Sequence, residues 1–561
     1  MQSVYNIAQI CALKGLRNAV LSPGSRCAPL TVSFVRHPQI STYTISDERS
    51  AGFIALGMSD ITKLPTVLIC TSGSAGLNYS PAIAEAYYRQ VPLLILTADR
   101  PAEWIDQADG QTIRQAGMYG AHVKKSYSLP LSDDEHVDNR WYYERVINEA
   151  INLALSFPPG PVHINIPFRE PFYPKHEFGY SEDCKIIDLI HNTYEPNQHM
   201  LQSLSDELSQ YPKILIVCGQ HSYNPSLNDA LNIFSHSWRA PLLADIIANM
   251  NACSHLITMH DWILNDGNDL NKFTPDILIT CGQSVISKNL KKFLRTCKPH
   301  QHWHVGKSTE APDTFQSLSK IISADPVSFF SLLKPTHKAA ESHPYYEEWQ
   351  QLNFLYKTSI ERYFEQESPF SEAEVVYRLL QNLPEHSLVY LSNSMPVRYA
   401  NAINVFTKKN VEYFCNRGTS GIDGVLSTAY GAALKTDKMV TVIIGDLAAI
   451  YDRNAFWNQY QPPNLRIVVI NNGGGIIFSL IDGPSTLPEL EEYFVTRQTI
   501  SLKNTIKDTG MEYMSIKDKP ALMRALNSFY ENSYVSKVME VHFETTQSKK
   551  HWQSFKQSVK R

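Results

Sequence analysis

Two short segments of the chain place oxygen-bearing side chains directly after apolar runs. Asp446 follows VTVIIG, and Asn472 ends the segment LRIVVINN, which three glycines follow. Mg²⁺ takes oxygen ligands and usually keeps phosphate or water oxygens in its shell, so few protein ligands are needed. Asp446, Asn472 and the carbonyl of Gly474 are the candidate ligands. This pattern predicts a cradle for a divalent metal ion and a diphosphate.

Two buried strands and a connecting segment would position this cradle. Both apolar runs are rich in Val and Ile and end in turn residues, which is typical of parallel strands whose carboxyl ends lie side by side. Ligands of open α/β sheets bind at those ends. The connecting segment DRNAFWNQY is helix-like, so its start could offer backbone N–H groups to a diphosphate. The glycines let the backbone approach the ligand closely.

Each half of the pattern also has an ordinary explanation. A Gly-Asp pair after a strand is commonly a turn or a helix cap, and NNGGG alone could be a flexible loop. Taken together, the two halves resemble the diphosphate-binding motif of thiamine-diphosphate enzymes. That family typically has a glycine where this chain has Leu447, and the departure favours one branch of the family.

Length and composition limit the class of protein. A chain of 561 residues exceeds what one hydrophobic core usually serves, so we expect two to four domains. A net charge of −4 gives no reason to expect a nucleic-acid partner. Nine cysteines without a C-x-x-C pair indicate reduced thiols. The chain has no secretory signal pattern and no apolar run of about 18 residues, so we expect no membrane span and a cytoplasmic protein.

Three blocks alternate short apolar runs with longer helix-compatible stretches, which predicts three α/β domains, each a mostly parallel sheet flanked by helices. They span residues 1–180, 190–335 and 350–561. The basic carboxy-terminal segment QSKKHWQSFKQSVKR is expected to be a solvated helix end without a function. The expected strands are NAVLSPG, TYTISDE, TVLICTSG, LLILTADRP and PVHINIPF, then KILIVCGQ, PLLADI, DILITCG and HWHVG, then SLVYLSNS, VEYFCNRG, VTVIIGD, RIVVINN and VMEVHFE.

Glu48 is the candidate acid for thiamine chemistry. It follows the strand-like TYTI and opens a helix-like run, where an acid is ordinarily a first-turn residue with Ser46 or Asp47 as the cap. A carboxyl group that is hydrogen-bonded to the pyrimidine ring of thiamine diphosphate can also promote the reactive tautomer of that cofactor. The neighbouring motifs favour this second interpretation.

Six motifs carry the resemblance. They are SPGSR at 22–26, SDER at 46–49, TADRP at 97–101, NSMPVR at 393–398, NRGTSGIDGVLSTAYGAA from 416 and INNGGGIIFSL from 470. In this order they resemble the 2-succinyl-5-enolpyruvyl-6-hydroxy-3-cyclohexene-1-carboxylate synthases, the thiamine-diphosphate enzymes of menaquinone biosynthesis. The first and third blocks carry the motifs, whereas the middle block matches mainly in length and strand rhythm.

The resemblance implies a reaction and a cofactor site. The reaction is the decarboxylation of 2-oxoglutarate and the conjugate addition of the succinyl carbanion equivalent to isochorismate, with Mg²⁺ or Mn²⁺ holding thiamine diphosphate. Blocks one and three would be the pyrimidine-binding and diphosphate-binding domains. Glu48 would activate the pyrimidine, Ile422 would bend the cofactor, and Gly445 and Leu447 would flank the diphosphate. Asp446, Asn472 and Gly474 would be the metal ligands.

The substrate residues are predicted from the same motifs. Both substrates are dicarboxylates, and the planar guanidinium of arginine suits a carboxylate, although each arginine taken alone is more commonly a surface charge. In the middle block, ISKNL matches a Lys-Arg pair of some relatives, with Asn289 lacking the charge. Gly110 stands where some relatives have a polar residue, and Cys27 is expected to be a spectator thiol. The predicted substrate residues are Ser25, Arg26, Arg100, Gln111, Lys288, Ser394, Arg398 and Arg417.

Two other functions stay open at this point. Another thiamine-diphosphate 2-oxoacid lyase, such as an acetolactate synthase or an oxoacid decarboxylase, could use the same fold. A non-catalytic cofactor-binding protein is the second, although the retained Glu48 argues against it. The resemblance also implies sites between block one of one subunit and block three of another, and therefore a homodimer or homotetramer.

Overall fold

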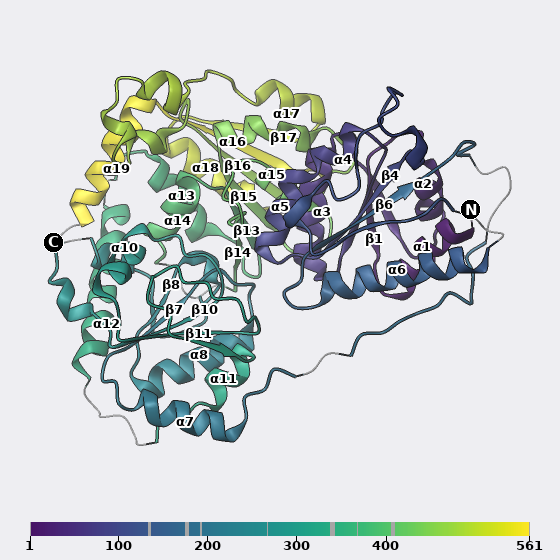
Figure 1. Cartoon of the computed structure of the whole chain (residues 1–561). Helices are drawn as coiled ribbons and strands as arrows, with labels where there is room; N and C mark the ends of the chain where they lie inside the picture. The colour runs from purple at the N-terminus through teal and green to yellow at the C-terminus, as the bar shows by residue number, and fades with distance from the viewer. Residues whose placement is uncertain are drawn as a thin grey trace.

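The computed structural model describes residues 2–132, 136–173, 179–190, 193–265, 267–336, 343–366, 368–405 and 410–559. In these residues the chain forms three parallel sheets of six strands each, and helices cover the sheets (Figure 1). The predicted fold class is therefore confirmed. The three sheets fall inside the three predicted blocks, and the block boundaries themselves stay a prediction.

The first sheet has the strand order β2-β1-β3-β4-β6-β5. Alternate residues of β3 enter different cores: Val67 and Ile69 pack with α1, α2 and α6, and Leu68 and Cys70 pack with α3 and α5. Both faces of the sheet are thus buried, as a near-continuous apolar run requires. The strands are β1 (Asn18–Leu21), β2 (Ser41–Thr44), β3 (Thr66–Cys70), β4 (Leu93–Asp99), β5 (Ser126–Ser128) and β6 (Pro161–Pro167), and the helices are α1 (Gln2–Leu13), α2 (Ala28–Val35), α3 (Glu48–Thr62), α4 (Ser74–Asn78), α5 (Ser80–Arg89) and α6 (Val137–Leu155).

The central sheet has the order β12-β11-β10-β7-β8-β9, so the chain changes direction across the sheet between β7 and β10. A long segment after β6 leads from the first domain to α7 (Figure 1). The strands are β7 (Ile214–Cys218), β8 (Leu242–Ala244), β9 (Leu256–Ile257), β10 (Ile277–Cys281), β11 (Gln301–Gly306) and β12 (Lys320–Ser323), and the helices are α7 (Gln198–Leu208), α8 (Pro225–Trp238), α9 (His260–Ile263), α10 (Lys288–Cys297) and α11 (Pro326–Leu332).

The third sheet has the order β14-β13-β15-β16-β18-β17. Its strands β15 and β16 pair in parallel from Val440 with Leu465 to Gly445 with Ile470, which brings the two predicted cradle segments to one edge. The strands are β13 (Leu388–Leu391), β14 (Glu412–Phe414), β15 (Val440–Gly445), β16 (Leu465–Asn471), β17 (Glu512–Ile516) and β18 (Lys537–His542), and the helices are α12 (Pro344–Glu365), α13 (Glu372–Asn382), α14 (Met395–Ala402), α15 (Val425–Ala433), α16 (Asp446–Tyr451), α17 (Lys503–Thr509), α18 (Lys519–Phe529) and α19 (Thr545–Val559).

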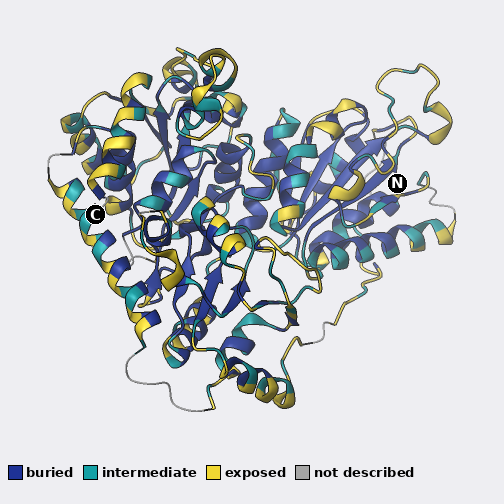
Figure 2. Ribbon diagram, turned by 60° about the vertical axis from the view of Figure 1, so that its left-hand side comes forward, coloured by how far each residue is buried: buried dark blue, intermediate teal, exposed yellow. Residues whose placement is uncertain are grey.

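Helices α3 and α15 join the first and third domains at very close range. A Cβ atom on Gly57 would lie 1.8 Å from the carbonyl oxygen of Thr428, and one on Gly431 would lie 1.9 Å from that of Ile54. Only glycine permits this approach of two backbones. Buried residues of both helices belong to one cluster that extends into both sheets, and Figure 2 shows most of the strands inside the molecule dark blue.

Two expectations about helices are wrong. The helix after β15 begins at Asp446, and only a short 3-10 turn (Arg453–Phe456) lies within DRNAFWNQY. The carboxy-terminal helix α19 is not simply a solvated end, because Trp552, Phe555 and Val559 are buried. These three side chains recur at helical spacing and place one face of α19 in the core between the central and third domains.

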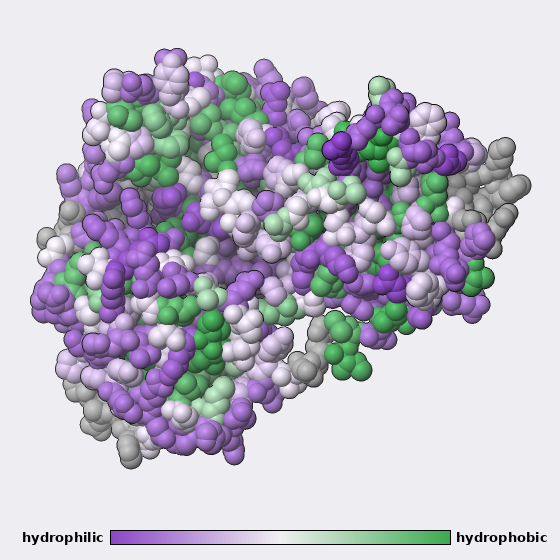
Figure 3. Space-filling model, viewed as in Figure 1, coloured by the Kyte–Doolittle hydropathy of each residue, from purple (hydrophilic) through white to green (hydrophobic). Residues whose placement is uncertain are grey.

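The outer surface is mainly polar in the view of Figure 3, where hydrophobic residues form separate groups. Among the described residues, none of the helices is both long and apolar enough to span a membrane. All nine cysteines are free, and eight of them are buried.

Candidate active site

A cavity of about 350 Å³ opens at the carboxyl ends of β13, β15 and β16. The position agrees with the rule that open α/β sheets bind ligands at these ends. Its walls contain all nine residues predicted in the third block: Ser394, Arg398, Arg417, Ile422, Gly445, Asp446, Leu447, Asn472 and Gly474.

Asp446 stands at the base of this cavity with 3% of its surface exposed. Its Oδ1 accepts a hydrogen bond from the backbone N–H of Leu447 at 2.9 Å, and Oδ2 accepts one from Nε2 of Gln498 at 2.6 Å. Burial raises the pKa of Asp446, and hydrogen bonds from Gln498 and the backbone of the 473–474 loop oppose that rise. A carboxyl group in such a position would be held ionised by a bound cation.

The glycines give this cavity the shape of a cradle. A Cβ atom on Gly445 would meet no atom within 4 Å, so the backbone there is open to a ligand. Gly474 has φ +152°, and its Cβ would lie 2.7 Å from the carbonyl oxygen of Val495. Asn472 is 4% exposed and donates from Nδ2 to Oε1 of Glu372 at 3.2 Å, which leaves its amide oxygen for another partner.

These donors fit a small hard cation. The side-chain oxygens of Asp446 and Asn472 and the carbonyl of Gly474 form an all-oxygen set, which suits Mg²⁺ completed by phosphate and water. Among the described residues, no cluster of three or more His, Cys, Asp or Glu side chains could hold a metal.

Arg398 and Arg417 bring two cations to the same cavity. Arg398 donates from Nη1 to the carbonyl oxygen of Ser394 at 2.5 Å, and burial together with Arg417 lowers its pKa. Arg417 donates from Nη1 to Oδ1 of Asn393 at 3.2 Å, and its buried Nε has no hydrogen-bond partner in the described chain. Neither guanidinium forms an ion pair with a described carboxylate. Two adjacent cations without an ion pair favour an anionic ligand.

The backbone that carries these arginines is locally constrained. Ser394 has φ +72°, a conformation that costs energy for a residue other than glycine and clusters at functional sites. Asn393 donates from Nδ2 to the carbonyls of Asn416 at 2.6 Å and Gly421 at 2.7 Å, and so ties the end of β13 to the loop that carries Arg417. Sequence reasoning did not single out Asn393, although it lies within the NSMPVR motif.

Lys288 lies in an adjoining cavity and not in the cradle itself. This second cavity, of about 230 Å³, shares Met395, Arg398 and Ile477 with the first. Lys288 begins α10 and is exposed, and Asn289 also lines this cavity.

Glu48 lies at the carboxyl edge of the first sheet. It opens α3 after the cap Asp47, whose Oδ1 accepts hydrogen bonds from the N–H groups of Arg49 and Ser50. Burial is the largest cause that raises the pKa of the half-buried Glu48, and Asp47 adds to it. Glu48 does not line the cavity that contains Asp446 in the same chain.

The other first-domain candidates surround the same edge. Arg26 is 7% exposed, donates to the carbonyl oxygen of Phe168 at 2.9 Å and lies over the Phe172 ring at 4.6 Å. Arg100 is engaged by its own loop, through Asp109 at 2.6 Å and the carbonyl of Gly110 at 2.9 Å. Neither guanidinium lines the cradle.

Two more predicted residues and one residue that was not predicted lie in the loops of the first domain. Ser25 is exposed, and Gln111 has φ +55°. Gln115, which sequence reasoning missed inside GQTIRQ, is buried and supports the loops by accepting from the N–H of Gly73 at 2.9 Å and donating to the carbonyl of Ala98 at 3.0 Å.

Glu85 is a further residue that sequence reasoning missed. Its buried carboxylate accepts hydrogen bonds from the N–H of Gly418 at 2.9 Å and from the N–H and hydroxyl of Thr419, both at 2.7 Å. It thereby fixes the loop that carries Arg417 against the first domain. An acid inside the apolar run AIAEAYY was the available signal.

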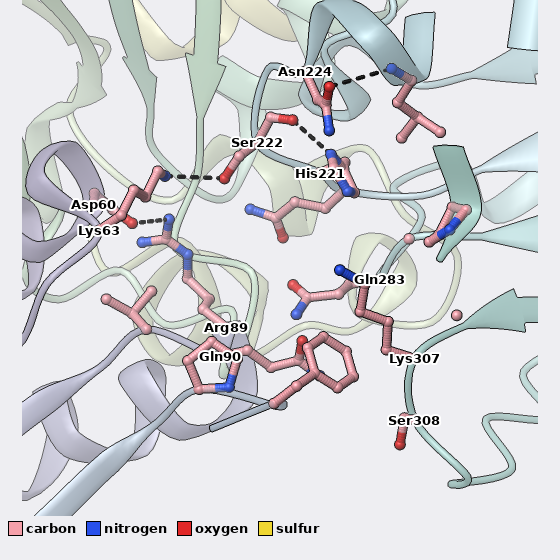
Figure 4. A pocket seen from close by; sticks show the side chains of 18 of the residues that line it. Asp60, Lys63, Arg89, Gln90, His221, Ser222, Asn224, Gln283, Lys307 and Ser308 are labelled. Carbon is pink, nitrogen blue, oxygen red and sulfur yellow. Dashed lines mark hydrogen bonds and ion pairs between the residues drawn. The ribbon is translucent and has the colours of Figure 1, made fainter. Parts of the chain in front are cut away.

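A larger cavity of about 450 Å³ lies where the first domain meets the central domain (Figure 4). Its charged groups are mostly compensated: Arg89 pairs with Asp60 at 2.8 Å, and Lys307 pairs with Asp325 at 2.9 Å. It contains none of the predicted site residues. Cavity size therefore does not select the candidate site here, whereas the two arginines beside an oxygen cradle favour the cavity of about 350 Å³.

Comparisons with known proteins relate the chain to thiamine-diphosphate enzymes. Residues 3–118 match the family model of the thiamine pyrophosphate enzyme N-terminal TPP binding domain, and residues 191–391 match that of the middle domain of thiamine pyrophosphate enzymes. A solved thiamin diphosphate-dependent enzyme from Mycobacterium smegmatis superposes with a TM-score of 0.71 at 16% identity, covering 96% of this chain and 99% of its own. At that identity the likeness establishes the fold alone.

Relatives in sequence identify the family more narrowly than the fold does. The 2-succinyl-5-enolpyruvyl-6-hydroxy-3-cyclohexene-1-carboxylate synthase of Cytophaga hutchinsonii is 44% identical, with 100% of this chain and 99% of the relative covered. The synthases of the same name from Flavobacterium johnsoniae and Porphyromonas gingivalis are 37% and 36% identical, each over 96% of this chain and 95% and 94% of the relatives. The chain belongs to the 2-succinyl-5-enolpyruvyl-6-hydroxy-3-cyclohexene-1-carboxylate synthase family of thiamine-diphosphate-dependent enzymes.

Proposed function

We propose that the chain decarboxylates 2-oxoglutarate and joins the remaining four-carbon unit to isochorismate, giving 2-succinyl-5-enolpyruvyl-6-hydroxy-3-cyclohexene-1-carboxylate and CO₂ in menaquinone biosynthesis. The observation that carries this proposal is the oxygen cradle around Asp446 in one cavity with Arg398 and Arg417. A cofactor diphosphate with its metal needs the first feature, and carboxylate substrates need the second.

In this proposal Asp446, Asn472 and the carbonyl of Gly474 bind Mg²⁺ or Mn²⁺, and Gly445 and Leu447 flank the diphosphate. Ile422 is 41% exposed and lines the cavity, so it can support the cofactor in a bent shape. Bound thiamine diphosphate supplies a nucleophilic carbon for the oxo group of 2-oxoglutarate and an electron sink for the loss of CO₂.

Glu48 exchanges a proton with the aminopyrimidine ring of the cofactor. Its raised pKa suits this role, because a general acid–base group acts best when its pKa lies closer to the working pH. The partial burial that raises the pKa also keeps bulk water from competing for the proton.

The cationic residues orient the substrate carboxylates. Arg398 and Arg417 offer forked donors in the cradle cavity, and Ser394 adds a hydroxyl group. Arg26, Arg100, Gln111 and Ser25 present further donors at the carboxyl edge of the first sheet. Held carboxylates place the reacting carbons close together and lower the entropic part of the barrier.

The active unit contains at least two subunits in this proposal. Glu48 and Asp446 have complementary roles, yet they do not line the same cavity within one chain. A second copy would supply the first-domain edge to the third-domain cavity, which makes a homodimer the smallest active form and a homotetramer compatible with it.

The test is a paired assay with thiamine diphosphate and Mg²⁺. The protein is incubated with 2-oxoglutarate and either isochorismate or pyruvate, and CO₂ release and product mass are followed. We expect a product with the mass of the named synthase product only when isochorismate is present. Consumption of pyruvate alone would reject the proposal in favour of an acetolactate synthase or decarboxylase activity.

A further inference from the structure

Aromatic contacts hold the carboxy-terminal helix α19 beside the substrate residues. Trp552 packs on Tyr399 of α14 with ring centroids 4.9 Å apart, and Phe555 packs on Trp262 at 5.5 Å. Helix α14 also carries Arg398. The position of α19 is therefore fixed relative to a predicted substrate residue.

Lys556 follows Trp552 by one helical turn and lies at the edge of the buried face. Its ammonium is 5.6 Å from the centroid of the Trp552 ring, and the side chain is half-buried. Lys556 lines the cavity of about 230 Å³ that also contains Lys288 and Arg398. Three cations from α10, α14 and α19 thus surround one cavity.

The described part of this cavity contains more basic than acidic side chains. Asp261 is the one carboxylate among the described residues that line it, and its Oδ1 accepts a hydrogen bond from the hydroxyl of Ser287. Lys288 and Arg398 have no ion pair with a described carboxylate. Positive charge gathered in a partly buried cavity attracts a small anion more strongly than the same charge on an open surface.

We propose that Lys556 is a further substrate-binding residue, which together with Lys288 binds a carboxylate of isochorismate. The inference rests on the proposed function and deepens it. Loss of CO₂ leaves one carboxylate on the four-carbon unit, and isochorismate brings two more, so three carboxylates need cationic partners. Arg398 borders both cavities, so the adjoining cavity is within reach of a ligand in the cradle cavity.

The test compares three variants by steady-state kinetics with each substrate varied in turn. Lys556→Gln removes the charge at similar length, Lys556→Arg keeps the charge, and Lys550→Gln removes an exposed cation elsewhere on α19. We expect Lys556→Gln to raise the KM for isochorismate about 10- to 100-fold, as for a lost charge-assisted hydrogen bond. The KM for 2-oxoglutarate and the melting temperature should stay close to those of the wild type.

Two further results complete the test. Lys556→Arg should recover most of the isochorismate affinity, and Lys550→Gln should behave as the wild type. Calorimetric titration of the cofactor-free protein with isochorismate should show the same loss for Lys556→Gln. An unchanged KM for isochorismate, an equal rise for both substrates or an equal effect of Lys550→Gln would overturn the inference. Wild-type protein that does not use isochorismate would instead reject the proposed function.

Discussion

The carboxyl edges of the first and third sheets carry the two halves of one proposed chemistry, but they differ in completeness. In the third domain, strand pairing brings Asp446, Asn472 and Gly474 to one cavity, whose walls also contain Arg398 and Arg417. In the first domain, Glu48 and Arg26 share a sheet edge without lining that cavity. In the proposed site, one sheet builds the cofactor cradle, and the activating acid comes from another surface.

The largest expected loss of turnover comes from a substitution in the first domain. Replacing Glu48 by Gln keeps the size of the side chain and removes its ionisable proton. We expect turnover to fall by about 10²- to 10⁴-fold, because general acid–base catalysis contributes that much. Cofactor affinity, measured by titration calorimetry, should change little. The conclusion would fail if the variant kept wild-type turnover with cofactor bound.

A mixing experiment tests whether Glu48 and Asp446 of one site come from different chains. Glu48→Gln and Asp446→Ala subunits are each expected to be inactive as pure preparations. After subunit exchange, hybrid dimers contain one site with both native residues, so activity should return to about a quarter of the wild-type level. Exchange is followed by native mass spectrometry with differently tagged chains. Complete exchange without recovered activity would show that each chain builds its own site.

The stability of the protein should depend on pH through Asp452, which lies near the contact between the first and third domains. This carboxyl group is fully buried and accepts hydrogen bonds from the backbone N–H of Ser427 at 2.8 Å and its hydroxyl at 2.7 Å. Burial raises the pKa of Asp452 to about 7. The folded state therefore binds this proton more tightly than the unfolded state, and the group's contribution to stability decreases as pH rises from about 4 to about 7.

Asp452→Asn tests this pH dependence. The amide cannot ionise and can keep one acceptor and one donor for Ser427, so the variant should lose less stability between pH 5 and 8 than the wild type. Denaturant midpoints measured across that range would decide it. Asp276→Asn, a change at a half-buried carboxylate in the central domain, is the control. Parallel pH curves for wild type and Asp452→Asn would contradict the raised pKa.

The smallest expected effect is at Cys27, beside Arg26 in the first-domain edge. Burial raises the pKa of this thiol, and its Sγ donates to the carbonyl oxygen of Gly24 at 3.1 Å. A protonated, buried thiol is a poor nucleophile. Cys27→Ser should therefore keep activity within about threefold and lose about 1 kcal/mol of stability at most. A much larger loss of kcat would show that the thiol takes part in the reaction.

All central strands were predicted, whereas four of the six edge strands were missed. All fourteen expected strand segments contain an observed strand, because buried parallel strands have continuous runs of Val, Ile and Leu. The four missed strands are β5, β9, β12 and β17, and each lies at an edge of its sheet. Edge strands are short or partly polar, so their hydrogen bonding depends on a neighbour that the local sequence does not reveal.

The candidate site residues also differ in how well the sequence predicts them. Asp446, Asn472 and Gly474 were predictable because each follows a strong strand signal, and parallel pairing then fixes their proximity. Glu85, Gln498 and Lys556 were not, since each reaches the site from an element far away in the chain. Only Glu85 had a local signal, as an acid inside the apolar run AIAEAYY.

The sequence by itself determined the three-sheet architecture and the chemistry available at two strand-end edges, because apolar periodicity and short motifs are local properties of the chain. Tertiary structure decided which of those groups share a cavity. The glycine-mediated contact of α3 with α15 joins the first and third domains, but Glu48 does not line the cradle cavity of its own chain. The packing of Trp552 and Phe555 places Lys556 in one cavity with Arg398. Such distances depend on how helices pack, and packing between remote segments is not encoded in any one of them.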